Sequence, residues 1–184
     1  MKNKGFYQLL LVLAGFCCLP QVYADTLRPS IDINLIIDGS SGLAGVKEEV
    51  SSWVLKRLDQ LIIDGDRVTV WSSGTPAKIV YTGKINGNTD RDAVKKSIQD
   101  ISGSGTIADF SGALKDAASR PSSGLCYTLL ISASPSALSS LLSGPQAGLM
   151  RYSRVEEFSG WRAIVVGLNL DAKVKRAAAN FFGS

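Results

Sequence analysis

The feature that most constrains the fold is a regular alternation of strand-like and helix-like segments from residue 31 to residue 182. The strand-like segments are short runs of β-branched and apolar residues, whereas the segments between them repeat apolar residues at spacings of three and four. Strands separated by helices predict crossover connections and a sheet that is covered on both faces. The expected strands are 31–37, 67–71, 78–82, 127–132 and 162–168, and the expected helices are 43–61, 90–101, 109–118, 137–142 and 171–182.

Two of these segments indicate how the sheet is arranged. Segment 127–132 is almost entirely apolar, which is typical of a central strand in a parallel sheet. Segment 78–82 follows its predecessor after a short Ser-Gly-Thr-Pro turn, so we expect it to pair antiparallel at an edge. The pattern predicts an α/β fold: a doubly wound, mostly parallel central sheet with one antiparallel edge strand and helices on both faces.

Residues 1–24 have the pattern of a signal peptide. Lys2 and Lys4 form a positively charged start, and residues 9–19 are an apolar run that is too short to span a membrane as a mature helix. Small residues at the −3 and −1 positions predict cleavage after Ala24. We therefore expect an exported protein, periplasmic or secreted, in which residues 25–184 form a single domain.

A bacterial lipoprotein is the competing interpretation of the same segment. Leu13, Ala14 and Gly15 approach a lipobox, but Phe16 stands directly before Cys17, where a lipobox requires a small residue. Lipid anchoring is therefore disfavoured.

Composition narrows the function classes. The chain contains no histidine, which excludes a Ser-His-Asp relay and histidine-ligated zinc. Loss of Lys2 and Lys4 takes the net charge from +4 to +2, and no long basic cluster predicts binding to nucleic acid. After cleavage Cys126 is the single thiol, and no later apolar run is long enough to span a membrane. We expect a protein that is not an enzyme.

Three segments should meet at the carboxyl ends of the strands, where ligand sites form in open α/β sheets. They are residues 38–42 after the first strand, 105–106 before the third helix and 132–134 after the fourth strand. Asp38, Ser40 and Thr106 would place hard oxygen ligands together there. Such ligands suit Mg²⁺ or Mn²⁺.

Residues 31–182 resemble a von Willebrand factor A domain, the fold also found in integrin I domains. The segments that carry the resemblance occur in the family's order. They are an apolar strand that runs into Asp-x-Ser at Asp38, the strand start Asp66-Arg67-Val68, the turn Gly105-Thr106 before an Ala/Leu helix, an apolar strand and the late strand 164–167.

The resemblance implies a degenerate form of the family's metal-ion-dependent adhesion site. Asp38 and Ser40 match the first two positions of Asp-x-Ser-x-Ser, and Thr106 matches the threonine of the second loop. Gly42 stands at the second serine position, and Ser132 or Ala133 stands where the family has a second aspartate. The alternative is that Asp38, Ser40 and Thr106 only cap helices and close turns.

The function implied by the resemblance is protein–protein interaction or adhesion with another protein, with weak or lost dependence on metal. The alternative is a structural subunit of an envelope, secretion or conjugation assembly. A third interpretation is a small hydrolase that uses Asp38 and Asp109. Residue types and position predict that the partner-binding residues are Ser41, Gly42, Ser134, Arg151, Tyr152 and Arg154.

Overall fold

The computed structural model describes residues 29–122, 125–134, 137 and 153–168. The predicted signal peptide, the expected closing helix at 171–182, and Arg151 and Tyr152 lie outside these residues. The elements in chain order are β1 (Asp32–Ile37), the 3₁₀ turn η1 (Ser41–Leu43), α2 (Lys47–Leu61), β2 (Arg67–Ser72), β3 (Lys78–Lys84), α3 (Asn88–Gln99), α4 (Phe110–Ser119), β4 (Cys126–Ser132), β5 (Ser153–Phe158) and β6 (Trp161–Leu168).

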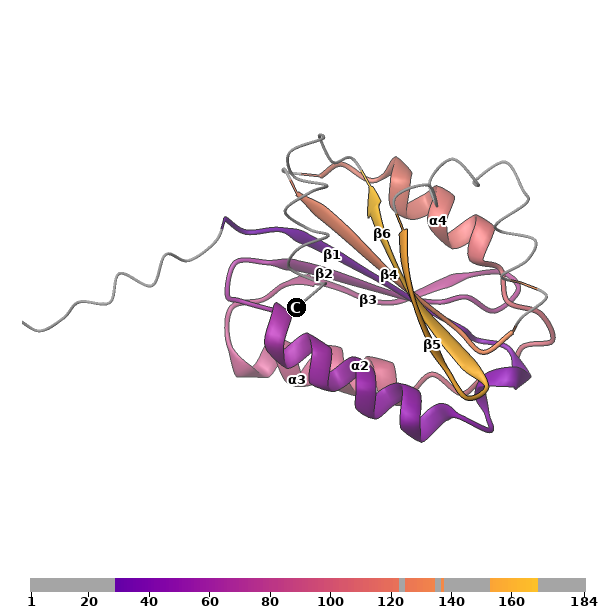
Figure 1. The fold of residues 1–184 in the computed structure, drawn as a ribbon. Helices are drawn as coiled ribbons and strands as arrows, with labels where there is room; N and C mark the ends of the chain where they lie inside the picture. Colours follow the sequence, from indigo (N-terminus) through magenta and orange to yellow (C-terminus); the bar gives the residue numbers. More distant parts are fainter. Residues whose placement is uncertain (1–28, 123–124, 135–136, 138–152, 169–184) are drawn as a thin grey trace, which may run out of the picture.

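The strands form one six-stranded sheet in the order β3-β2-β1-β4-β6-β5 (Figure 1). Its core is parallel, because β1 pairs parallel with both β2 and β4, and β3 pairs antiparallel with β2 at one edge. Every residue of β1 is buried, as expected for a strand with neighbours on both sides and helices on both faces. The predicted α/β class with a parallel core is confirmed.

The sheet differs from the prediction of a single antiparallel strand. β6 pairs antiparallel with β4, and β5 pairs antiparallel with β6. The two strands form a hairpin whose turn is Ser159-Gly160, and Gly160 has a φ of 87°, which glycine adopts without strain. The composition and periodicity of an apolar strand such as β6 are the same in either direction, so the sequence could not distinguish parallel from antiparallel pairing with β4.

Helices cover both faces of the sheet (Figure 1). On one face, α2 and α3 bury Val50, Val54 and Ile98 against alternate residues of the central strands. On the other face, α4 buries Phe110 and Leu114 among residues of β1, β2, β4 and β6. The apolar helix faces predicted from the spacing therefore pack into the two hydrophobic cores, one on each face of the sheet.

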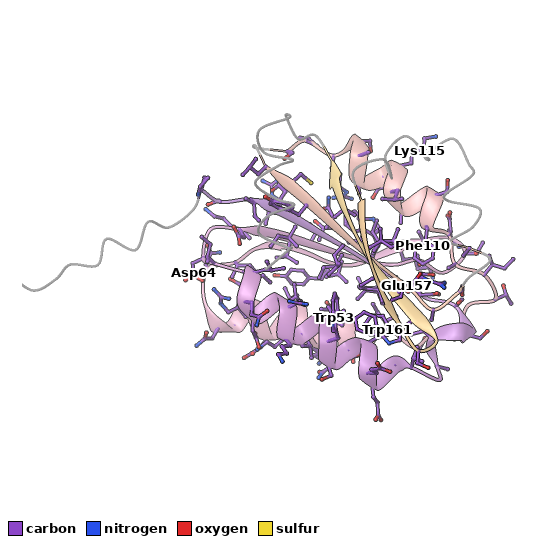
Figure 2. All side chains as sticks on the ribbon, in the orientation of Figure 1. Trp53, Asp64, Phe110, Lys115, Glu157 and Trp161 are labelled. Atoms are coloured by element: carbon purple, nitrogen blue, oxygen red, sulfur yellow. The ribbon has the colours of Figure 1, made fainter. Side chains whose placement is uncertain are left out.

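An aromatic cluster joins the β5–β6 hairpin to α2. The Phe158 and Trp161 rings stack with centroids 3.9 Å apart, and Trp53 of α2 meets Trp161 edge-to-face at 5.5 Å (Figure 2). Trp161 is buried. The cluster fixes the hairpin against the helical layer at the end of the sheet where β1, β2 and β4 finish.

Both ends of the described domain lie at the opposite end of the sheet. The chain enters β1 at Asp32, which pairs with Cys126 at the start of β4, and it leaves β6 at Leu168, which also pairs with Cys126. No helix among the described residues is long and apolar enough to cross a membrane.

Candidate functional site

The Asp38 carboxylate ties together the loops that follow β1 and β4. Asp38 is fully buried, and its Oδ1 accepts a hydrogen bond from the Ser40 amide at 2.8 Å. Its Oδ2 accepts one from the Ala133 amide, also at 2.8 Å. Each carboxylate oxygen therefore satisfies one backbone donor that would otherwise be buried without a partner.

Serine hydroxyls extend this connection. The Ser40 and Ser134 hydroxyls are 2.8 Å apart and share a hydrogen bond. The Ser132 hydroxyl accepts from the Ser134 amide and donates to the Ser134 carbonyl, both at 3.1 Å. A Cβ added at Gly42 would lie 3.2 Å from the Ser134 hydroxyl, so Gly42 leaves the room that this serine occupies.

The loop before α4 is attached through backbone contacts. The Gly105 amide donates to the Gly39 carbonyl at 2.8 Å, and the Ser41 amide donates to the Gly105 carbonyl at 2.7 Å. The loop after β2 is attached to the same loop before α4 through Thr75, whose hydroxyl donates to the Ile107 carbonyl at 2.8 Å. The loops after β1 (residues 38–42), β2 (73–77) and β4 (132–134), with residues 105–107 before α4, thus form one cross-linked surface, which we call the carboxyl-end face.

This close approach predicts that Gly105→Ala lowers the free energy of unfolding by roughly 1–3 kcal/mol. A Cβ at Gly105 would lie 2.8 Å from the Gly39 carbonyl oxygen, which is closer than real contacts allow. Urea denaturation of the variant measures the loss. Gly45→Ala is the matched control, because a Cβ there meets nothing within 4 Å. Equal stability of the two variants would contradict the packing described for Gly105.

The structure brings some of the predicted site residues together and separates others. Asp38, Ser40 and Ser134 form the hydrogen-bonded connection described above. Ser41, Gly42 and Thr106 are exposed on the same carboxyl-end face, Thr106 directly after Gly105. Arg154 instead lies on the outer strand β5, opposite Val165 of β6.

The described residues do not fit an octahedral Mg²⁺ or Mn²⁺ ion. Such an ion takes about six oxygen ligands in octahedral geometry, of which one or two are carboxylates and several are waters. Here Asp38 is buried with both oxygens already accepting backbone hydrogen bonds, and the Ser40 hydroxyl is paired with Ser134. Within the described ranges, no three His, Cys, Asp or Glu side chains gather in a way that could hold a metal.

The other chemistry-bearing side chains also have local partners. Asp109 caps α4, since its Oδ1 accepts from the Gly112 amide at 2.8 Å. Burial, and then the charge of Asp32, raise the pKa of the Cys126 thiol to about 11, although the Asn34 amide opposes this shift by donating to the sulfur. Cys126 is therefore a neutral thiol at neutral pH, as expected for a buried structural cysteine.

Sequence reasoning missed two features. Ile107 is 66% exposed on the carboxyl-end face, and its position outside any apolar period was a usable signal. Asp32 and Asn34 alternate with apolar residues in β1 and point to the α4 side, where they line a polar pocket. Their alternation was visible in the segment Ile-Asp-Ile-Asn-Leu.

No protein-family model matches the sequence, and no curated protein shows significant similarity to it. Among solved structures, the chain is similar to a von Willebrand factor type A protein from Catenulispora acidiphila, at 18% identity and a TM-score of 0.43. The match covers 48% of this chain and 22% of that chain, so this chain spans less than a quarter of that protein's length. Similarity at this level does not place the chain in that family.

Proposed function

We propose that this chain is an exported, von Willebrand factor A-like module that binds another protein through its carboxyl-end face, and that it does so without a bound metal. Residues 1–24 are removed on export in this proposal. The resemblance of the ordered motifs supports the assignment, as does the meeting of two of them, Asp-x-Ser at Asp38 and Gly105-Thr106, at the carboxyl ends of the parallel strands.

The observation that carries the proposal is the use of the Asp38 carboxylate as a connector. Because both oxygens hold backbone amides, the loops after β1 and β4 keep one arrangement without help from an ion. A preorganised surface loses less conformational entropy when a partner docks. Within the described residues, this surface presents small polar groups and one large apolar side chain, Ile107, which suits contact with a protein.

The test is affinity capture from the envelope fraction of the native cells, with protein purified from cells that express the full chain. We expect Ile107→Asp to lose most of the captured partner, because the substitution places a charge in the centre of the contact. Val80→Asp is the control, since Val80 is 42% exposed but lies on edge strand β3. Capture should be the same in EDTA and in excess Mg²⁺.

The outcomes separate the parts of the proposal. Full capture by Ile107→Asp would show that the partner docks elsewhere. Loss of capture in EDTA alone would contradict metal-free binding. A variant with Arg151→Ala, Tyr152→Ala and Arg154→Ala tests the segment that was predicted from residue types, independently of Ile107.

A further inference from the structure

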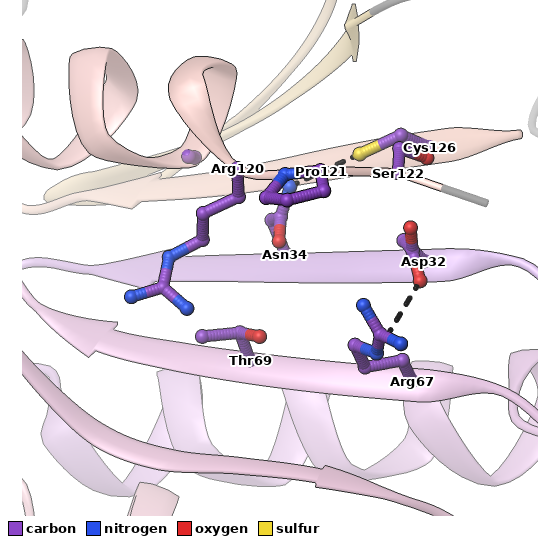
Figure 3. Close-up of a pocket in the computed structure, with 9 residues that line it drawn as sticks. Asp32, Asn34, Arg67, Thr69, Arg120, Pro121, Ser122 and Cys126 are labelled. Carbon is purple, nitrogen blue, oxygen red and sulfur yellow. Dashed lines mark hydrogen bonds and ion pairs between the residues drawn. The ribbon is translucent and has the colours of Figure 1, made fainter. Parts of the chain in front are cut away.

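A small polar pocket lies at the end of the sheet opposite the carboxyl-end face. Its volume is about 80 Å³, and its walls come from β1, β2 and β4 and from the end of α4 (Figure 3). The lining includes Asp32, Asn34, Arg67, Thr69, Arg120 and Cys126. Asp32, Arg67 and Cys126 are register partners at the amino ends of their strands, so the fold itself assembles this part of the lining.

The pocket floor is polar in the middle of a parallel core, where apolar residues are usual. Asn34 and Thr69 are more than nine-tenths buried. The Asn34 side-chain amide donates to Cys126 Sγ at 3.1 Å and to the Thr128 hydroxyl at 3.3 Å. Burying polar side chains on central strands is unfavourable unless they are satisfied, so these interactions hold a polar floor in place.

Two guanidinium groups line the pocket, and each has a carboxylate beside its Nε atom, which accepts a hydrogen bond from Arg120 and makes a longer ion pair with Arg67. Arg67 Nε lies 4.0 Å from Asp32 Oδ1, and Arg120 Nε lies 3.2 Å from Asp116 Oδ2. Arg120 is also held above the Trp71 ring, with its Cζ 5.4 Å from the ring centroid. Figure 3 shows the two guanidinium groups on either side of Thr69.

The terminal amino groups of both arginines remain available. Among the described residues, the hydrogen bonds and ion pairs of Arg67 and Arg120 side chains involve Nε alone. An arginine whose Nε faces an acid keeps two parallel N–H donors at its end, the geometry that binds a carboxylate in a bidentate manner. The side chains are 55% and 37% exposed, so a ligand can reach them from solvent.

We propose that this pocket binds a monoanionic carboxylate between Arg67 and Arg120. The two guanidinium charges are balanced by the two neighbouring acids, Asp32 and Asp116, so the site has no surplus charge to hold a dianion and would recognise one carboxylate through the paired N–H donors. The volume suits a carboxylate with few further atoms, either a free small acid or the carboxyl end of a peptide. The site lies away from the carboxyl-end face and is independent of the proposed docking function.

The experiment is an NMR titration of the ¹⁵N-labelled protein, purified from cells that express the full chain, with acetate up to about 50 mM. Saturable shifts should appear at the Nε resonances of Arg67 and Arg120 and at the side-chain amide of Asn34, with a dissociation constant on the order of 1 mM because solvent screens the arginines. A short peptide with a free carboxyl end and its amidated form identify the source. If the free-ended peptide binds more tightly than the amidated peptide, the ligand is a peptide end. If the two peptides bind equally while acetate still binds, the ligand is a free small acid.

Substitutions distinguish recognition of the carboxylate by the two arginines from non-specific attraction to positive charge. Arg67→Gln with Arg120→Gln should weaken acetate binding at least about tenfold, whereas Arg91→Gln should not, because Arg91 is ion-paired with Asp64 away from the pocket. Arg120→Lys should also bind weakly, since lysine keeps the charge but not the paired donors. Backbone amide spectra confirm that each variant is folded. Absence of saturable shifts, equal binding by the double variant, or tighter binding of inorganic phosphate would overturn the proposal.

Discussion

Asp38→Ala should lower the free energy of unfolding by roughly 3 kcal/mol, because the substitution leaves two buried backbone amides without acceptors. These amides belong to Ser40 and Ala133, each now 2.8 Å from a carboxylate oxygen. Asp38→Asn should lose less, since the amide oxygen still accepts one bond while the NH₂ group faces the other donor. Urea denaturation monitored by circular dichroism measures both variants.

The control for this prediction is Asp92→Ala, an exposed position on α3 where surface substitutions change stability by about 0.5 kcal/mol or less.

The same samples also test the role of metal. Because the Asp38 oxygens already hold backbone donors, millimolar Mg²⁺ or Mn²⁺ should leave the melting temperature of the unaltered protein unchanged. A metal-induced rise that disappears in Asp38→Ala would contradict the description of Asp38 as a connector.

Trp161→Ala should lower the free energy of unfolding by about 3–5 kcal/mol, the range for removing a large aromatic side chain from a core. Trp161 is 2% exposed, stacks on Phe158 and meets Trp53 edge-to-face, so its removal opens a cavity between the hairpin and α2. Denaturant unfolding gives the loss, and the near-ultraviolet circular dichroism spectrum reports the aromatic cluster.

Trp161→Phe is the conservative partner of that variant. It keeps an aromatic ring beside Phe158, and it removes the indole N–H, a buried donor without a hydrogen-bond partner among the described residues. Loss of an unsatisfied donor offsets part of the lost packing, so we expect a decrease of less than about 1.5 kcal/mol. A phenylalanine variant as unstable as the alanine variant would show that the indole makes contacts beyond those of the cluster.

The helices and strands that could be predicted from the sequence are those whose apolar residues follow a clear pattern. The apolar residues of α2 recur at helical spacing, and β4 is apolar apart from Thr128 and its final residue Ser132, so both were identified within a few residues of their observed bounds. β5 was not identified, because an edge strand is not obliged to be apolar and Ser153–Phe158 contains one arginine and two glutamates. Its turn at Ser159-Gly160 was the available signal.

Part of the candidate site could be predicted from the sequence, and part could not. The rule that ligand sites form at the carboxyl ends of parallel strands correctly predicted that the loops of Asp38 and Ser134 would meet. The role of Asp38 could not be predicted, since its second partner is the backbone amide of Ala133. A backbone amide has no residue-type signature, so one sequence pattern is compatible with a metal ligand and with a connector between loops.

The antiparallel direction of β6 has a consequence for how the domain can be held. Because Leu168 and Asp32 flank Cys126, the chain enters and leaves the described domain on one side, and the Asp38 loops lie on the other. Attachment close to residue 29 or residue 168, to a bead, a membrane anchor or a neighbouring domain, would leave Ile107 pointing away from the support. A parallel last strand would have delivered the chain to the same side as the Asp38 loops.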